Sequence, residues 1–282
     1  MKRCIFGVSV AVAALLLASC GSDRAYDYEY YGLNTPVKSV LVTTYEAESK
    51  FGDVVKGDLA HDGHYLATFN GVGNLESIAS YDDDGDLTSL ERFKYNREDR
   101  LIELSSFDDD GDIDYQLTYS YEGDQMVAEC QQNYWGDTEE VTQYSHTWRG
   151  EQLLETSVTS GSTLVAKIKY SRCDKSGSEW VTYNGDGEEV ARGSEELEDN
   201  RIVKRTVDGR SLEVRWNSKK LPVYLRNAHL HNNTMVSWYN NDDECVYYVE
   251  YEYDDEGNWI KQIVYEGEIK KPVTISERVI TY

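Results

Sequence analysis

The feature that most constrains the fold is an internal repeat of 26 residues between Tyr81 and Tyr121. Tyr81 and Phe107 are one repeat apart, and so are Gly85 and Gly111. Each copy has two short runs joined by polar turns, and one of these turns is the acidic sequence D-D-D-G-D. A repeat at a fixed spacing indicates one supersecondary unit that is copied along the chain.

The runs inside the repeat alternate between apolar and polar residues, as residues 113–121 show. A period of two places the two kinds of residue on opposite faces of a β-strand. The glycine of each Asp-Gly step can take the positive φ of a two-residue hairpin turn. The sequence therefore predicts an all-β chain, an antiparallel meander of repeated β-hairpins that forms one long twisted or curled sheet. The predicted tight turns contain Gly85, Gly111, Gly187 and Gly257.

The repeated pattern, aromatic-Asp/Asn-x-x-Gly-x-hydrophobic, is clearest in Y-E-Y-D-D-E-G-N-W-I-K-Q-I-V-Y at residues 251–265. It resembles the YD (Rhs-type) repeat. The run that starts at Pro36 and the C-terminal E-R-V-I-T-Y resemble the ends of a group of uncharacterised bacterial lipoproteins with such repeats. Residues 150–240 depart most from the pattern. The resemblance implies a hairpin-repeat sheet and brings no known active site.

The N-terminus has the pattern of a lipoprotein signal. Lys2 and Arg3 precede an apolar run that ends in L-L-A-S-C-G. This pattern predicts a signal peptide at residues 1–19 and a lipidated Cys20, and the alternative is an ordinary signal with an incidental cysteine. We then expect a tether at residues 20–35 and the β domain at residues 36–282. Gly21 argues against retention in an inner membrane, so we expect an outer-membrane anchor, on either the periplasmic or the surface face.

The formal net charge of −24 restricts the partners of this chain. Nucleic acid is not expected, because phosphates require basic patches. We interpret the acidic residues as solvated turn and strand residues, and the alternative is attraction of cations or of a basic partner. Beyond Cys4 and Cys20 there are three cysteines, Cys130, Cys173 and Cys245. An odd number leaves one unpaired, and the spacing indicates neither a disulfide framework nor a zinc site.

Two acidic turns and two histidine pairs are candidate metal ligands. Residues 82–86 and 108–112 resemble half of a calcium loop, but a strand and not a helix follows each of them. We therefore interpret them as hairpin turns. The pair His61 and His64 and the pair His229 and His231 lack an identifiable third ligand, so ordinary histidines are the preferred interpretation. We predict no metal site and no cofactor.

No nucleophile, P-loop, dinucleotide or metalloprotease motif occurs in the sequence. The 23 tyrosines and 6 tryptophans are expected mostly to pack across strands. An exposed subset could bind glycan or peptide, with Tyr26, Tyr28, Tyr30, Tyr31 and Trp135 as candidates. These observations favour a membrane-anchored, exported lipoprotein that acts as a non-catalytic binding or scaffolding module of the cell envelope. The alternatives are a polysaccharide-acting hydrolase and an acidic inhibitor or immunity-like protein.

Overall fold

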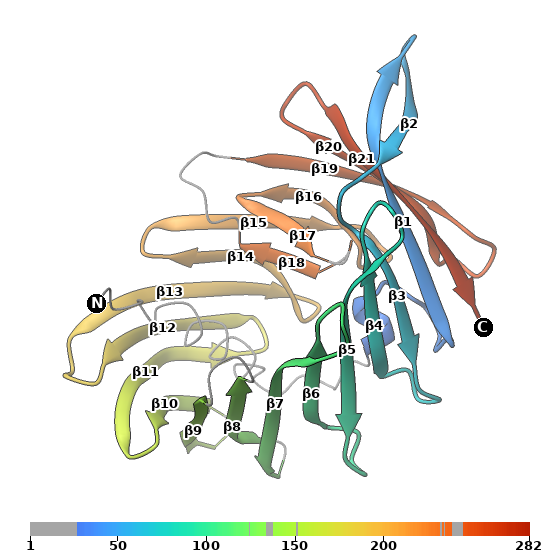
Figure 1. Ribbon diagram of the computed structural model, residues 1–282. Coiled ribbons are helices and arrows are strands. Elements are labelled where there is room, and N and C mark those ends of the chain that lie inside the picture. The colour runs from blue at the N-terminus through green and yellow to red at the C-terminus, as the bar shows by residue number, and fades with distance from the viewer. Residues whose placement is uncertain are drawn as a thin grey trace, which may run out of the picture. The chain divides into compact units, whose positions relative to one another are not determined.

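The computed structural model describes residues 27–282, except for 124, 134–137, 151, 232, 234 and 239–244. The described chain is almost entirely antiparallel β-structure (Figure 1), as the alternation of the sequence predicts. It divides into two compact units. The middle unit takes in most of residues 117–211, and the terminal unit takes in residues 27–116 and 212–282. Each unit is described separately below.

Among the described residues up to 160, the structure has one short helix and ten strands: α2 (Asp27–Tyr30), β1 (Ser39–Lys50), β2 (Asp53–Leu59), β3 (His64–Phe69), β4 (Leu75–Tyr81), β5 (Leu87–Tyr95), β6 (Leu101–Phe107), β7 (Ile113–Glu122), β8 (Gln125–Asn133), β9 (Thr138–Arg149) and β10 (Gln152–Ser160). The second half contains β11 (Thr163–Asp174), β12 (Gly177–Asn184), β13 (Glu189–Glu198), β14 (Arg201–Val207), β15 (Arg210–Trp216), β16 (Pro222–Arg226), β17 (Ala228–His231), β18 (Met235–Trp238), β19 (Val246–Tyr253), β20 (Trp259–Glu266) and β21 (Lys271–Thr281).

The first and last strands of the chain are hydrogen-bonded neighbours in the terminal unit. Ser39 of β1 lies opposite Thr281 of β21 on one side and opposite Thr68 of β3 on the other. Figure 1 shows β1 between these two partners. The prediction of one long twisted or curled sheet is therefore wrong, because the sheet closes on itself where β1 pairs with β21. Local alternation cannot encode this pairing, since its partners lie at the two ends of the domain.

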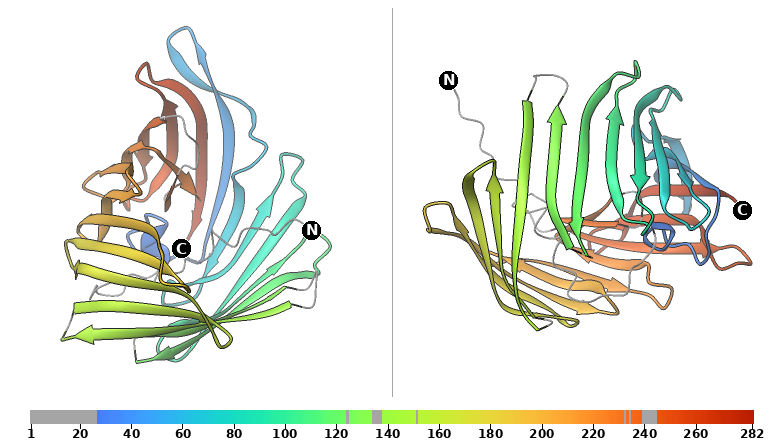
Figure 2. Two further views of the ribbon diagram at one scale, coloured as in Figure 1. Left: turned by 90° about the vertical axis from the view of Figure 1, so that its left-hand side faces the viewer. Right: turned by 90° about the horizontal axis from the view of Figure 1, so that it is seen from below.

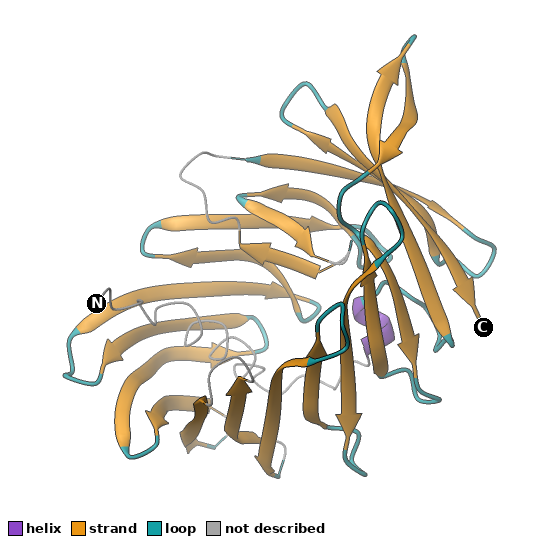
Figure 3. Cartoon of the chain, viewed as in Figure 1, coloured by secondary structure: helices purple, strands orange, loops and turns teal. Residues whose placement is uncertain are grey.

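The core of the terminal unit forms where the segment after α2 packs against the sheet. Tyr31 and Leu33 are buried among Val40, Tyr65 and Phe69. Tyr31 makes edge contacts with the rings of Tyr65 and Phe69, at centroid distances of 6.3 Å and 5.4 Å. Helix α2, which directly precedes this buried segment, is purple in Figure 3. Part of the expected tether, from Asp27 onward, therefore belongs to the folded unit.

Arg278 of β21 anchors this segment from the other side. Its Nη1 donates to the Tyr31 carbonyl at 2.8 Å, its Nη2 donates to the Gly32 carbonyl at 3.3 Å, and its Nε donates to the Trp259 carbonyl. The guanidinium lies 3.9 Å from the centroid of the Trp259 ring. Burial lowers the pKa of Arg278 to about 9, although the neighbouring Tyr65 and Asp254 act in the opposite direction.

The middle unit is a run of hairpins in which β9 to β14 pair in chain order, as Figure 2 shows. One cluster of its core contains Leu153, Ile168, Tyr170 and Cys173, and Trp180 packs against it. Cys173 is disulfide-bonded, which the sequence did not lead us to expect. Its partner is not among the described side chains. A disulfide is typical of an oxidising, exported environment.

The repeat of the sequence reflects one turn geometry that recurs along the chain. In the turn that starts at Asp82, the N–H of Gly85 donates to the Asp82 carbonyl, and the N–H of Asp82 donates to the Asp86 carbonyl. Oδ1 of Asp82 also accepts the Asp86 N–H at 2.8 Å. Turns that start at the following residues have the same three bonds: Asn70, Asn96, Asp108, Asn184, Asn217 and Asp254.

These turns have three loop residues instead of the expected two, and the last of them has a positive φ. Gly85, Gly111, Gly187 and Gly257 occupy this position with φ values of 87°, 85°, 83° and 80°. Asp99 and Lys220 occupy it in two other turns, so glycine is favoured but not obligatory. The aspartate or asparagine at the start is selected because its side chain accepts a backbone N–H. Turn chemistry thus accounts for the repeated pattern.

Candidate functional site

The candidate site is a cavity of about 400 Å³ in the terminal unit. Its walls come from strands β1, β3, β16, β19, β20 and β21, from the loop before β3, and from the hairpin formed by β17 and β18. The lining side chains and loop residues are Thr44, Asp62, Gly63, Tyr65, Leu225, His229, Leu230, Asn233, Tyr247, Gln262, Val264, Thr274 and Ser276. The lining combines apolar groups, two tyrosines, amides, hydroxyls and one carboxylate.

A chain of hydrogen bonds connects the polar groups of the wall. Nδ2 of Asn233 donates to Oγ of Ser276 at 2.8 Å and to Oε1 of Gln262 at 3.1 Å. Nε2 of Gln262 donates in turn to the Asn233 carbonyl at 2.6 Å. Gln262 and Ser276 are cross-strand partners on β20 and β21, with side chains that are 1% exposed. Asn233 therefore fixes the turn between β17 and β18 to the sheet.

The loop before β3 is held by Thr44 and His64, both of which are buried. Oγ1 of Thr44 donates to the Gly63 carbonyl at 2.8 Å. Nδ1 of His64 accepts the Thr44 N–H at 3.2 Å, and its other nitrogen lies 2.6 Å from the Ala60 carbonyl. Because a carbonyl can only accept, Nε2 of His64 carries the proton and Nδ1 does not. His64 thus acts as a fixed support for the loop.

Tyr65 and Tyr251 connect the cavity to the core beneath it. Tyr65 is 3% exposed and lines the cavity. Burial raises its pKa, and the positive charge of Arg278 partly opposes this effect. Tyr251 accepts a hydrogen bond from Gln262 at 3.2 Å and donates to the Pro222 carbonyl at 2.9 Å. Burial also raises the pKa of Tyr251, so both phenols stay protonated at neutral pH.

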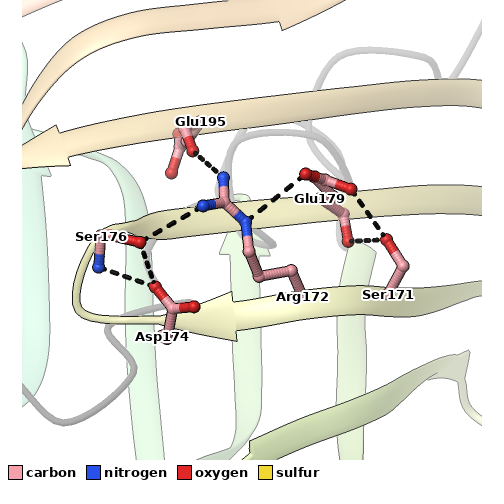
Figure 4. A network of polar contacts seen from close by, with 6 residues as sticks. All are labelled: Ser171, Arg172, Asp174, Ser176, Glu179 and Glu195. Atoms are coloured by element: carbon pink, nitrogen blue, oxygen red, sulfur yellow. Dashed lines mark hydrogen bonds and ion pairs between the residues drawn. The ribbon is translucent and has the colours of Figure 1, made fainter.

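A second polar cluster lies in the middle unit around Arg172 (Figure 4). Its guanidinium lies 3.5 Å from a carboxylate oxygen of Glu179, and it donates to Oγ of Ser176 at 3.2 Å and to the Glu195 carbonyl at 3.4 Å. Asp174 accepts from the hydroxyl and the N–H of Ser176, and these bonds lower the pKa of Asp174. The cluster ties the turn between β11 and β12 to β13, so we interpret it as structural.

Several residues singled out in the sequence lie away from the cavity. His61 is 3.5 Å from Asp83 on the exposed surface, and no group of three or more His, Cys, Asp or Glu suited to a metal occurs among the described residues. Cys20, Tyr26 and Trp135 lie outside the described residues, and so do the side chains of Cys130 and His231. Cys245 is a free, half-buried thiol whose pKa is raised by burial.

The aromatic candidates of the N-terminal segment have different environments. Tyr30 is 49% exposed, whereas Tyr31 is buried in the core and the ring of Tyr28 packs against Gly73. Of the selected residues that the structure describes, only His229 and the loop before His64 contribute to the cavity region. Asn233 and Gln262 were missed because single amides in a strand and a turn carry no motif.

No described helix is long and apolar enough to cross a membrane.

The comparisons with known proteins identify no family. No protein-family model matches the sequence, and no curated protein matches it. The resemblance to YD-repeat lipoproteins is therefore wrong as a family assignment, and the recurring turn geometry explains the shared pattern. Among solved structures, a porin-like protein from Bacteroides uniformis is similar, with 10% identity and a TM-score of 0.40. The match covers 87% of this chain and 97% of that chain, a similarity too low to support a functional conclusion.

Proposed function

We propose that this chain is an exported, lipid-anchored protein of the cell envelope that binds a small polar molecule in the cavity of its terminal unit. The observation that carries the proposal is the cavity itself. Its volume of about 400 Å³ lies within the range of sites for small molecules. Tyrosine and aliphatic side chains supply apolar contact area, and the amides and hydroxyls supply directional hydrogen bonds.

A binding function has more support than catalysis. Among the described lining residues, Asp62 is the one carboxylate, whereas glycoside hydrolysis uses a pair of carboxylates that flank the scissile bond. The hydroxyls of Thr44 and Ser276 bond to each other at 2.9 Å, with no imidazole bonded to either oxygen. The polysaccharide hydrolase and the acidic inhibitor therefore remain weaker alternatives. The net charge of −24 supports the absence of nucleic acid among the partners.

The envelope location is part of the same proposal. It rests on the signal pattern that ends at Cys20 and gains support from the disulfide of Cys173. An outer-membrane anchor follows from the residue after Cys20, which is glycine. The substitution Cys20→Ala should release the protein from the membrane fraction. A variant that stays bound to membranes after a carbonate wash would refute the anchor and leave the cavity untouched.

The binding proposal is tested by filling the cavity. Thr274 lies on β21 and lines the cavity, so Thr274→Trp should occupy part of its volume. Thr281→Trp adds the same side chain at an exposed position on the same strand and serves as the control. Saturation-transfer NMR with a mixture of small basic, neutral and acidic compounds should give signals for the wild type and Thr281→Trp, and no signals for Thr274→Trp. Equal signals in all three proteins, or no signals in any, would refute the proposal.

A further inference from the structure

The hydrogen bonds in the cavity wall determine which kind of partner atom a ligand must bring. Three backbone carbonyls, those of Asn233, Gly63 and Pro222, fix the direction of these hydrogen bonds, because a carbonyl only accepts. Gln262 must present Nε2 to the Asn233 carbonyl, so its Oε1 is the atom that accepts from Asn233. The atom of Asn233 that bonds Gln262 and Ser276 is therefore Nδ2. The orientation of both amides follows from the network itself.

Backbone carbonyls also fix which way the hydroxyl groups of the wall, and of Tyr251 beneath it, donate their protons. Oγ1 of Thr44 uses its single proton toward the Gly63 carbonyl, so the 2.9 Å contact between Thr44 and Ser276 requires Ser276 to donate. Ser276 in turn accepts from Asn233. Tyr251 uses its proton toward the Pro222 carbonyl and accepts from Gln262. The protons of these five side chains are therefore all directed at protein acceptors.

The wall consequently offers a ligand mainly hydrogen-bond acceptors. Gln262 and Ser276 are almost fully buried, so the acceptors within reach of a ligand are Oδ1 of Asn233, whose Nδ2 is used by the network, and the carboxylate of Asp62 at the exposed loop. The hydroxyl of Thr274 can take either role. No lysine or arginine lines the cavity in the part of the chain that the structure describes. An anionic ligand would find no lysine or arginine as a counter-charge, and His229 is the one imidazole of the described lining.

We infer that the cavity is selective for a small organic ammonium compound, whose N–H donors meet Oδ1 of Asn233 and whose charge meets Asp62. This inference rests on the proposed function, since it names the ligand class of the same cavity. The tyrosines of the lining suit such a ligand as well, because the faces of aromatic rings attract cations. The net negative charge of the chain further raises the local concentration of cations.

The test compares three probes of similar size that differ only in the head group: n-butylammonium, n-butanol and n-butyrate. Titrations followed by NMR at pH 7 should show the tightest binding for n-butylammonium and the weakest for n-butyrate. Asp62→Asn should weaken n-butylammonium binding by about two- to five-fold, because the carboxylate is exposed and solvent screens it. The same substitution should leave n-butanol binding unchanged. Glu268→Gln removes an exposed carboxylate outside the lining and should leave the binding of all three probes unchanged.

The outcomes separate this inference from the proposed function. If n-butanol or n-butyrate binds at least as tightly as n-butylammonium, and Thr274→Trp abolishes that binding, then the cavity is a binding site and the ammonium assignment is wrong. If Asp62→Asn and Glu268→Gln weaken n-butylammonium binding equally, the attraction comes from the general negative charge and the assignment is also wrong. If none of the probes binds and the wider mixture of compounds gives no signal either, the proposed function itself fails.

Discussion

Nη1 of Arg278, in the last strand, donates to the backbone carbonyl of Tyr31 at 2.8 Å and thereby connects the two ends of the folded chain. The same guanidinium donates hydrogen bonds to the Gly32 and Trp259 carbonyls and packs on the Trp259 ring. Arg278 is only 5% exposed. One side chain therefore holds the N-terminal segment, β20 and β21 together. This segment packs against Tyr65, which lines the cavity, so the anchor also supports the site.

Replacement of this anchor should destabilise the protein strongly. Arg278→Met keeps most of the side-chain volume but leaves the buried Tyr31 and Trp259 carbonyls and the partly buried Gly32 carbonyl without this donor, at a cost of about 2 kcal/mol or more in the free energy of unfolding. Urea denaturation measures this change. Arg97→Met, at an exposed turn, should leave the denaturation midpoint unchanged. Similar midpoints for the two variants would mean that Arg278 does not hold the segment.

Stability should depend on pH in the alkaline range through the buried tyrosines. Burial raises the pKa of Tyr65, Tyr144 and Tyr251 in the folded state, whereas tyrosines of the unfolded chain ionise near the ordinary value of 10.0. The stability that these phenols contribute is therefore complete below pH 10 and is lost as the pH rises above it. Arg278 acts in the opposite direction, because its pKa is lowered to about 9 and the cost of burying its charge falls as the pH rises.

The variant Tyr65→Phe isolates one of these groups. Between pH 10 and pH 12 the wild type should lose stability more steeply than the variant, because only the wild type has a proton to release at this position. Thermal unfolding followed by circular dichroism across this range gives the two slopes. Parallel slopes would show that Tyr65 ionises alike in the folded and unfolded states.

The alternation of apolar and polar residues was sufficient to predict the strands and the antiparallel pairing of successive hairpins. The 26-residue spacing between Gly85 and Gly111 also predicted where the acidic turns lie. Closure of the sheet was not predictable, because the pairing of Ser39 with Thr281 joins the ends of the domain and leaves no local signal. The cavity was missed for the same reason, since Asn233 meets Gln262 and Ser276 only after the chain has folded.

The glycines of the acidic turns test the account of the repeat. Gly85→Val and Gly111→Val should each lower the free energy of unfolding by roughly 1–3 kcal/mol, because φ values of 87° and 85° strain a β-branched residue. An added Cβ meets no atom within 4 Å at either position, so the cost is backbone strain alone. Gly71 lacks a positive φ and also has open space, so Gly71→Val should cost much less. Equal costs at all three positions would contradict this account.

The acidic turns should not bind calcium specifically. Oδ1 of Asp82 already accepts hydrogen bonds from the N–H groups of Asp84 and Asp86, at 3.0 Å and 2.8 Å. These bonds explain why an aspartate occurs at this position, and no metal is needed. Calcium takes six to eight oxygen ligands, more than one three-residue loop directs to one point. Isothermal titration at physiological salt should show no saturable site. A site of micromolar affinity that is lost in Asp84→Ala or Asp110→Ala would overturn this prediction.

A crystal structure of the mature protein with n-butylammonium shows directly whether the cavity between the sheet and the β17–β18 hairpin binds an organic ammonium compound. We expect electron density for the ligand in the cavity, with its nitrogen within hydrogen-bonding distance of Oδ1 of Asn233. The same cavity should be blocked by the indole in crystals of Thr274→Trp. Ligand density outside the cavity, or an empty cavity in crystals at saturating n-butylammonium, would show that the cavity does not bind this ammonium compound.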